Sequence, residues 1–296
     1  MSEQLFQPRS LEELDLRFPP ELEHISASSL KMAVRCEEQW RQRYVLGIKA
    51  PPGLSMLQGR ADHKAIEFSM VQKVDTHVDL PTREVQDRYV EELEIAVDSS
   101  GGLAEIEVRD ADTPQARQRA YDQARVHGQD VVASYHQLVA PQVQPLAVEK
   151  EFRLAVPELP VEVLGYIDLV GEIPLLASAE KVIIDRKRRA RRSLKIEPEW
   201  SLQAEIYQLA EPLPHDWHLS VTTKTPQVVA FEPELRQELP PRARSERLLQ
   251  QLVAKIGWLY QRFGPDEPWP TTGKMHPWAC GYCGYRDRCW GWKEEV

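Results

Sequence analysis

Two apolar, strand-like segments that each carry an acidic residue constrain this chain more than any other feature of its sequence. Residues 164–170 read LGYIDLV, with Asp168 in the middle, and residues 182–187 read VIIDRK. Side chains two residues apart on a strand point to the same face, so Asp185 and Lys187 should project together. A hairpin-like return of 17 residues can bring Asp168 beside Asp185. The sequence therefore predicts that three charged groups converge on one sheet.

Two carboxylates held side by side in a half-buried sheet repel each other unless a cation lies between them. Hard oxygen ligands favour magnesium or manganese, which would activate bound water and neutralise charge on a phosphoryl oxygen. Lys187 would orient the water or stabilise that charge. The alternative is that Asp168 is a turn or edge residue and that Asp185 and Lys187 form an ordinary exposed pair. From the three residues alone this alternative is favoured, but their apolar neighbours count against it.

Periodicity and turn residues predict the elements around these acids. Residues 1–25, with prolines among acidic residues, are interpreted as a loosely tied leader. Residues 75–112 are polar and poorly patterned, with a turn or flexible tip at 99–102. We expect helices over about 30–44 (capped by Ser28 or Ser29), 57–71, 113–139, 197–210 and 242–263, and strands over 146–156, 162–172, 181–187, 217–223 and 227–231. The strands between 146 and 187 should form an antiparallel meander.

The charge distribution limits the partners of the chain. Its net charge of -9 argues against a surface of uniformly positive potential, so nucleic-acid contacts must come from local clusters. One cluster places seven positive residues between 186 and 195: Arg186, Lys187, Arg188, Arg189, Arg191, Arg192 and Lys195. Composition alone leaves a solvated face and a nucleic-acid contact equally open. The apolar runs are too short to cross a membrane and no signal-like N-terminus is present, so we expect a cytoplasmic location.

The four cysteines amount to one set of metal ligands. Cys36 stands alone, whereas Cys280, Cys283 and Cys289 lie close together near the end of the chain. Four thiolates suit tetrahedral zinc or an iron–sulfur cluster, and a disulfide is not expected in a cytosolic chain. Zinc bound by two Cys-x2-Cys knuckles would need a second close pair, which Cys36 lacks. The alternative is a buried helix cysteine and an unrelated or incomplete C-terminal site.

An ordered set of motifs carries a resemblance to a known family. The motifs are Gly59-x3-His63, Gly165-x2-Asp168, Asp185-x-Lys187 and Gln203-x3-Tyr207. In this order they resemble the PD-(D/E)XK nuclease superfamily in its RecB-like branch, which includes CRISPR-associated exonucleases and AddB-type nucleases. The resemblance implies an α/β (α+β) fold: a central mixed β-sheet flanked by helices, with a restriction-endonuclease-like core. It also implies a single domain over 26–296, with a helical N-terminal part, a helical insertion at 75–140 and a C-terminal cluster-binding segment at 276–296.

The resemblance implies roles for individual residues. Asp168 and Asp185 match the acidic metal ligands, Lys187 matches the catalytic lysine, and His63 matches a helix histidine that lies beside or ligates the metal. Gln203 and Tyr207 match a helix motif that contacts the active site or DNA.

The residues around the catalytic lysine depart from the family pattern. The family usually has an apolar residue before the lysine and a small residue and a glycine after it, whereas Arg186, Arg188 and Arg189 stand here. The basic cluster would then lie at the mouth of the site, so we predict that Arg186, Arg188, Arg189 and Arg191 bind DNA.

These observations predict a metal-dependent DNA nuclease, with Mg²⁺ or Mn²⁺ as the catalytic cofactor. Similarity to the iron–sulfur subset of this branch implies that Cys36, Cys280, Cys283 and Cys289 hold a structural 4Fe–4S cluster, with zinc less favoured. The expected activity is exonucleolytic cleavage of single-stranded or unwound DNA ends, and the expected kind of protein partner is a helicase or an integrase. The first alternative is a non-catalytic or weakly catalytic module that binds DNA ends in a recombination, repair or CRISPR adaptation complex. A zinc-stabilised binding protein without nuclease chemistry is the second.

Overall fold

The computed structural model describes residues 16–174, 179–272 and 277–292. Most of the predicted leader (1–15), and residues 276 and 293–296 of the predicted cluster-binding segment, lie outside the described residues. The chain divides into two compact units. We name Met1–Ala50, Phe152–Gly165 and Pro240–Val296 the cysteine unit, and Pro51–Glu151 and Tyr166–Leu239 the sheet unit. The single domain predicted for residues 26–296 spans both.

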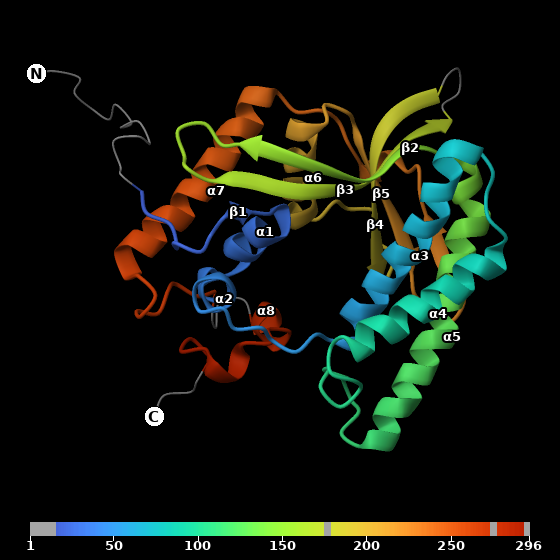
Figure 1. Cartoon of the computed structure of the whole chain (residues 1–296), viewed down its shortest axis with the longest axis horizontal. Helices are drawn as coiled ribbons and strands as arrows, with labels where there is room; N and C mark the ends of the chain where they lie inside the picture. The colour runs from blue at the N-terminus through green and yellow to red at the C-terminus, as the bar shows by residue number, and fades with distance from the viewer. Residues whose placement is uncertain (1–15, 175–178, 273–276, 293–296) are drawn as a thin grey trace, which may run out of the picture. The chain divides into compact units, whose positions relative to one another are not determined.

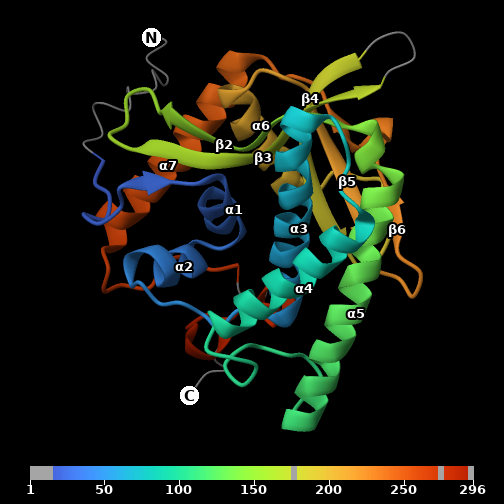
Figure 2. The ribbon, with the colours of Figure 1, turned by 45° about the vertical axis from the view of Figure 1, so that its right-hand side comes forward.

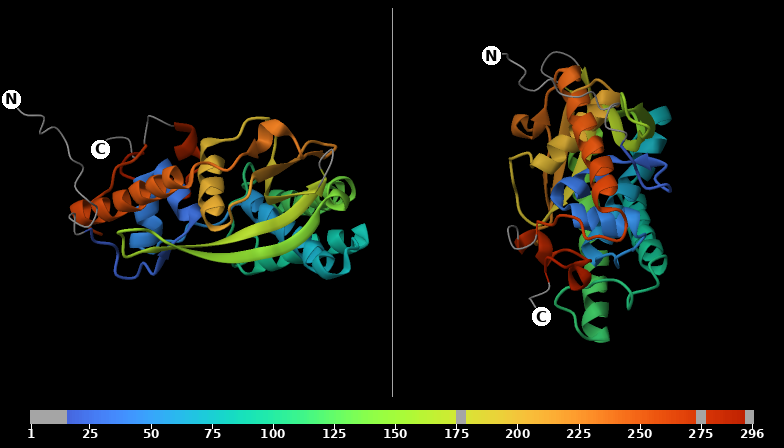
Figure 3. Two further views of the ribbon diagram at one scale, coloured as in Figure 1. Left: turned by 90° about the horizontal axis from the view of Figure 1, so that it is seen from above. Right: turned by 90° about the vertical axis from the view of Figure 1, so that its left-hand side faces the viewer.

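A mixed β-sheet forms the framework of the sheet unit. Its strands β3 (Glu162–Pro174) and β4 (Ala179–Arg189) are antiparallel, and β5 (His215–Val221) runs parallel to β4. The short strands β6 (Gln227–Val229) and β7 (Arg236–Gln237) are both antiparallel to β5. Strand β2 (Gln144–Ala155) pairs with β3, and the two run side by side as a long ribbon (Figure 3). The predicted mixed sheet is therefore confirmed.

Two long helices, α3 (Leu54–Thr76) and α5 (Pro114–Leu138), cover one face of this sheet, and α4 (Thr82–Asp98) packs against both of them (Figures 1 and 2). The short 3₁₀ helix η3 (Ala140–Gln142) follows α5. The prediction of an unpatterned stretch over 75–112 was wrong, because it contains α4. This helix buries an apolar residue at every fourth position, namely Val85, Tyr89, Leu93 and Val97. Each such buried side chain contributes about 1.5–3 kcal/mol, which is sufficient to fix an otherwise charged helix.

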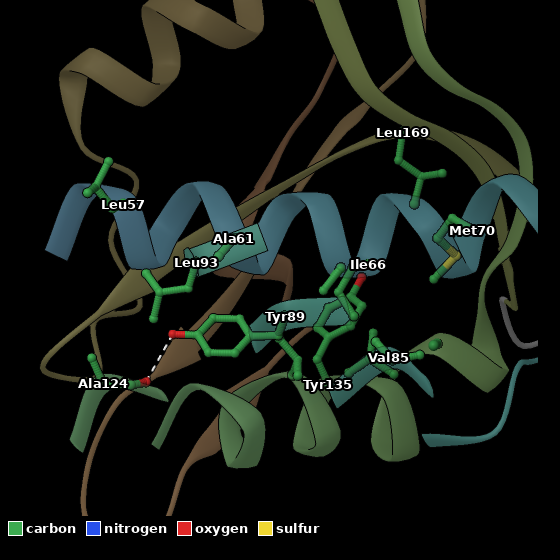
Figure 4. Packing of buried hydrophobic residues seen from close by; sticks show 14 of the residues in the cluster. Leu57, Ala61, Ile66, Met70, Val85, Tyr89, Leu93, Ala124, Tyr135 and Leu169 are labelled. Carbon is green, nitrogen blue, oxygen red and sulfur yellow. Dashed lines mark hydrogen bonds between the residues drawn. The ribbon is translucent and has the colours of Figure 1, made fainter. Parts of the chain in front are cut away.

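Tyr89 shows how closely these helices approach. A Cβ atom added to Gly128 of α5 would lie 1.9 Å from the Tyr89 ring, so only glycine leaves room for it. The Tyr89 hydroxyl donates a 3.0 Å hydrogen bond to the carbonyl of Ala124, one turn earlier on α5 (Figure 4). The two long helices of the predicted helical insertion, α4 and α5, thus pack on each other through specific contacts.

Helix α6 (Pro198–Ala210) covers the opposite face of the sheet. Alternate residues of β5 explain the two faces, since Trp217, Leu219 and Val221 pack with Trp200 and Ala204 of α6. His218 points the other way, where its ring shares a 2.9 Å hydrogen bond with the hydroxyl of Tyr135 on α5. The 3₁₀ helix η4 (Pro233–Leu235) adds Leu235 to the cluster under α6.

The cysteine unit is mainly helical. Its elements are β1 (His24–Ile25), α1 (Ala27–Arg35), α2 (Glu37–Trp40), the π-helix η2 (Arg41–Val45), α7 (Arg242–Phe263), α8 (Pro277–Gly281) and the 3₁₀ helix η6 (Arg286–Arg288). Strand β1 pairs in parallel with the start of β3, so residues 24 and 25 of the predicted leader are ordered in the sheet. No helix in the described part of the chain is long and apolar enough to span a membrane.

The predicted single helix over 30–44 is interrupted at Cys36. This residue is extended, with φ -164° and ψ 116°, so that α1 ends there and α2 begins at the next residue. The cap, Ser26, is also two or three residues earlier than predicted, because Ser26 and Ser29 form a reciprocal capping box. The interruption sets Cys36 apart from both helices.

Candidate active site

The register of β3 and β4 places the two predicted acids side by side. Leu169 pairs with Ile184, and this is where the pairing of β3 with β4 ends within the described residues. One step further along the same register, Asp168 lies opposite Asp185. The hairpin predicted from the 17-residue spacing is therefore present.

Lys187 binds the deeper of the two carboxylates. Its Nζ lies 2.6 Å from Oδ1 and 2.8 Å from Oδ2 of Asp185, whose side chain is fully buried. Burial raises the pKa of Asp185, and the neighbouring charge of Asp168 raises it further, against the opposing effect of Lys187. Asp185 and Lys187 project to one face of β4, as their spacing predicts.

His63 reaches the other carboxylate from α3. Its Nδ1 lies 3.1 Å from Oδ2 of Asp168, and its Nε2 lies 2.9 Å from the backbone carbonyl oxygen of Arg186. Both partners are acceptors, so the ring satisfies both when both of its nitrogens are protonated. Burial lowers the pKa of His63, but Asp168 outweighs burial and the net shift is upward. For Asp168 burial raises the pKa, and the contact with His63 brings it below the usual value.

The trailing helix motif extends this network from α6. Oε1 of Gln203 accepts a 3.3 Å hydrogen bond from Lys187 Nζ, and Nε2 of Gln203 donates a 2.9 Å bond to the Tyr207 hydroxyl. Gln203 and Tyr207 are one helical turn apart and both are buried. A continuous chain of contacts thus runs from Asp185 through Lys187 and Gln203 to Tyr207.

Sequence reasoning missed two acidic residues beside this site, Glu67 and Glu149. Glu149 of β2 lines a pocket together with His63, Glu67 and Asp168. Burial raises the pKa of Glu149, as do the nearby charges of Asp168 and Glu67. Its φ of +48° is unusual for a non-glycine residue and interrupts the strand geometry. Glu67 had a sequence signal, because it lies one turn after His63, whereas no spacing singled out Glu149.

The donor set suits a hard divalent cation. In residues 16–174, 179–272 and 277–292, no three His, Cys, Asp or Glu side chains are grouped closely enough to hold a metal ion as they stand. Asp168 and Asp185 are instead each bound by a protein cation, His63 and Lys187 respectively. Two adjacent carboxylates beside an imidazole are nevertheless ligands of the type that Mg²⁺ and Mn²⁺ accept.

Comparison with known proteins assigns this arrangement to a family. A family model described as the PD-(D/E)XK nuclease superfamily matches residues 24–290. The chain belongs to the PD-(D/E)XK nuclease superfamily. Members of it are generally phosphodiesterases that cut nucleic acid, and they typically use Mg²⁺ or Mn²⁺. The solved structure of SSO0001 is 13% identical and has a TM-score of 0.35, covering 77% of this chain and 97% of that chain. No curated protein matches the sequence.

The arginines around Lys187 of this PD-(D/E)XK superfamily member occupy different environments. The Arg186 side chain is on the opposite face of β4 from Lys187 and only 6% of it is exposed. Its guanidinium donates a 3.0 Å hydrogen bond to the Asp62 carbonyl and lies 4.1 Å above the Tyr135 ring. Most of this guanidinium is thus enclosed between α3 and α5, and the contact of Arg186 with DNA stays a prediction.

The remaining arginines lie closer to solvent. Arg188 binds both carboxylate oxygens of Asp62, at 2.9 and 3.1 Å. Arg189 pairs with Glu197 and lies 4.5 Å above the Trp200 ring, and Arg191 is exposed. Arg189 and Arg191 are thus the more exposed members of the predicted set.

The four cysteines gather in the cysteine unit. Cys36, Cys280, Cys283 and Cys289 line one pocket, although they do not form a ligand group for a single metal ion within the described residues. Burial raises the pKa of Cys283 and the other three thiols raise it further, against a hydrogen bond from the Tyr285 backbone.

Two glycines let the chain pass close to this pocket. A Cβ on Gly284 would lie 2.7 Å from Ala50, and one on Gly291 would lie 2.3 Å from Thr271. Thr271 also accepts a 3.6 Å hydrogen bond from the Cys36 thiol. The structure thus brings together the early cysteine and the C-terminal three, 244 residues apart at their closest in sequence, in a tightly packed segment.

Proposed function

We propose that the chain is a Mg²⁺- or Mn²⁺-dependent deoxyribonuclease of the RecB-like branch that trims single-stranded or unwound DNA ends. The observation that carries the proposal is the position of Asp168 opposite Asp185, with Lys187 bound to Asp185. A buried acid with a raised pKa beside a second acid is costly to maintain, and such pairs concentrate at catalytic centres.

Asp168, Asp185 and His63 would hold the cation. When bound, it supplies neutralisation of phosphoryl charge and activation of water. Lys187 places a positive charge where an oxygen of the scissile phosphate gains charge. Gln203 fixes the Lys187 ammonium through its 3.3 Å bond, and Tyr207 fixes Gln203 in turn. This is the reason we assign Gln203 and Tyr207 to the positioning of Lys187.

The decisive experiment uses single-stranded oligonucleotides labelled separately at each end, with and without Mg²⁺ or Mn²⁺. We expect Asp185→Asn and Lys187→Ala to reduce the rate of cleavage by about 10³-fold or more while DNA binding is retained. Lys181→Ala is the matched control, because this exposed lysine lies on the same strand. Cleavage by wild type and active-site variants at equal rates would overturn the assignment, and the two labels report the polarity of trimming.

The proposal extends to the cysteines, which we assign to a 4Fe–4S cluster. It is supported by the four thiols that line one pocket. A multi-iron cluster accepts one thiolate at each iron and so tolerates wider spacing than zinc. Cys36 would then tie the start of the chain to its end.

Anaerobic purification should give a brown protein that contains iron and sulfide. We expect Cys283→Ser to lose the colour and to lower the melting temperature, because a bound cofactor stabilises the folded state that holds it. A colourless protein with one zinc would contradict the cluster. Protein partners of the helicase or integrase type and a cytoplasmic location belong to the same proposal.

A further inference from the structure

A second pocket adjoins the candidate active site in the sheet unit. It has a volume of 210 Å³ and shares His63 and Lys187 with the active site. Its other walls include Ser55 and Gly59 from the first turns of α3, Arg188 from β4 and Ser220 from β5. Neither Asp168 nor Asp185 lines it, so the pocket extends beyond the acidic pair.

The pocket has the electrostatics of an anion site. Arg186, Lys187 and Arg188 line it with positive charge, and Asp62 is the acidic residue among its lining side chains. Helix α3 begins at Leu54, so Ser55 lies at its amino end, where the helix dipole favours negative charge. Basic side chains, a hydroxyl and a helix amino end are the donors with which proteins bind phosphate.

Two buried polar groups of this pocket lack a partner. Ser220 is 3% exposed and Arg186 is 6% exposed. The Ser220 hydroxyl and the Arg186 Nε have no hydrogen-bond partner among the residues that the structure describes. Buried polar groups in native proteins are nearly always hydrogen-bonded, so unpaired donors on one pocket wall indicate a ligand that accepts hydrogen bonds.

Gly59 gives independent support. The Gly-x2-Asp motif of β3 has a reason within the protein, because a Cβ on Gly165 would lie 2.5 Å from the Phe152 ring. Gly59, in the interior of α3, has no such reason, since a Cβ there would meet nothing within 4 Å. Glycine weakens the interior of a helix, so its presence beside open space indicates that the space is used.

We propose that this pocket binds one phosphate of the nucleic-acid strand next to the phosphate being cut. The inference rests on the proposed nuclease function, because Lys187 and His63 form the wall shared by the pocket and the active site. A phosphate held here fixes the register of the strand on the metal site. The four positive or donor groups Arg186, Arg188, Ser55 and Ser220 are its contacts.

The test measures binding without cleavage. Fluorescent single-stranded oligonucleotides of one sequence, with either a 5′-phosphate or a 5′-hydroxyl, are titrated in the presence of a chelator. We expect Gly59→Leu to weaken binding about tenfold by filling the pocket, and Ser220→Ala to weaken it about threefold by removing a donor. Gln72→Leu, which adds the same side chain further along α3, is the matched control and should bind as wild type does.

Folding and binding should change in opposite directions. Gly59→Leu improves the helix propensity of α3, and Ser220→Ala removes an unpaired buried hydroxyl, so neither variant should lower the melting temperature. Unchanged affinity in both variants would overturn the proposal, and so would a loss of affinity that merely follows a loss of stability. A loss confined to the 5′-phosphorylated probe assigns the pocket to a terminal phosphate, and an equal loss with both probes assigns it to an internal one.

The phosphate pocket and the nuclease function can each be refuted independently of the other. If wild type cleaves DNA but Gly59→Leu and Ser220→Ala match it in affinity and in KM, the phosphate pocket is wrong and the nuclease stands. If these variants bind DNA weakly but wild type does not cleave with Mg²⁺ or Mn²⁺, the nuclease assignment fails while the pocket survives as a binding site.

Discussion

The two faces of strand β4 carry charges of different kinds. On the face toward α6, Asp185 and Lys187 bind each other and connect to Gln203. On the face toward α3 and α5, Arg186 stacks on Tyr135, and Arg188 binds Asp62. The first set centres on the carboxylate of Asp185, whereas the second places Arg186 and Arg188 beneath α3 and α5.

Because side chains alternate along a strand, the proposed catalytic groups and the groups that hold α3 lie on opposite faces of β4. Residues 185 and 187 present the proposed catalytic groups, whereas residues 186 and 188, which line the proposed phosphate pocket, fasten α3, which carries His63, to the sheet. The rate of cleavage and the stability should therefore respond to mutations on opposite faces, and four measurements probe this division.

The largest effect on stability is expected for Asp62→Ala, on the face toward α3. Asp62 is 3% exposed and holds Arg188 through two hydrogen bonds, so its removal leaves a nearly buried guanidinium unpaired. We expect the free energy of unfolding to fall by about 3 kcal/mol, as measured by urea denaturation. The Asp62→Ala/Arg188→Ala double variant should regain part of this loss. Asp185→Ala should cost far less, and an equal cost on both faces would contradict the division.

Acid sensitivity compares two histidines on opposite faces of β5. Burial lowers the pKa of both His215 and His218 to about 3. Between pH 3 and pH 6.5 the unfolded state therefore binds more protons, so stability falls as the pH falls through this window. Each histidine should cost about 2 kcal/mol at pH 5 relative to neutral pH.

The corresponding variants are His215→Leu and His218→Leu. Each should remove its share of the acid loss in denaturation curves at pH 7 and pH 5, relative to wild type. Asp216, whose pKa is raised to about 6 by burial, acts in the opposite sense and is common to both comparisons. At pH 7 only His218→Leu should destabilise, because it leaves the Tyr135 hydroxyl without its partner. An acid response unchanged in both variants would refute the assignment of neutral buried imidazoles.

Gln203→Ala tests the positioning of Lys187 from α6. Loss of the 3.3 Å bond to the ammonium should reduce kcat about tenfold, equivalent to about 1.4 kcal/mol, with KM nearly unchanged. Gln203→Glu keeps an acceptor and should recover part of the rate. A change in KM alone would place Gln203 in DNA binding instead.

The smallest effect is expected at the end of β4, for Arg189 and for Arg191 just beyond it. Arg189→Gln and Arg191→Gln should each reduce the slope of log binding constant against log salt by about one unit per lost phosphate contact. Arg262→Gln on α7 is the control for a general loss of charge. Slopes equal to that of wild type would return this loop to an ordinary solvated face.

Much of the fold follows from local sequence. The predicted helix over 242–263 matches α7 at both ends, and the predicted strands coincide with β2 to β6 to within a few residues. Asp168 beside Asp185 could be predicted because strand register follows from the hairpin and from alternation. These features depend on neighbours in the chain, which the sequence displays directly.

The remainder depends on tertiary contacts. Alternation already places Arg186 opposite Lys187, but its burial depends on α3 and α5 covering that face. The break at Cys36 comes in a stretch with helical periodicity, so no local signal marks it. Glu149 joins the site through a backbone conformation with φ +48°, which no local sequence feature predicts. Periodicity reports which residues share a face, and not what covers that face.

The end of pairing between β3 and β4 has a consequence for how the site is built. The bonds from Ile183 N to the Pro214 carbonyl and from Thr222 N to the Arg189 carbonyl show that odd-numbered residues of β4 turn their backbone toward β5. The backbone carbonyl of Arg186 therefore points to the side of β4 on which β3 no longer pairs. His63 Nε2 lies 2.9 Å from this carbonyl oxygen, where a strand N–H group would otherwise be. The pairing of β3 with β4 thus ends next to the pair formed by Asp168 and Asp185. The His63 imidazole, which comes from α3, thus fills a backbone hydrogen-bonding position that a further paired strand would otherwise take.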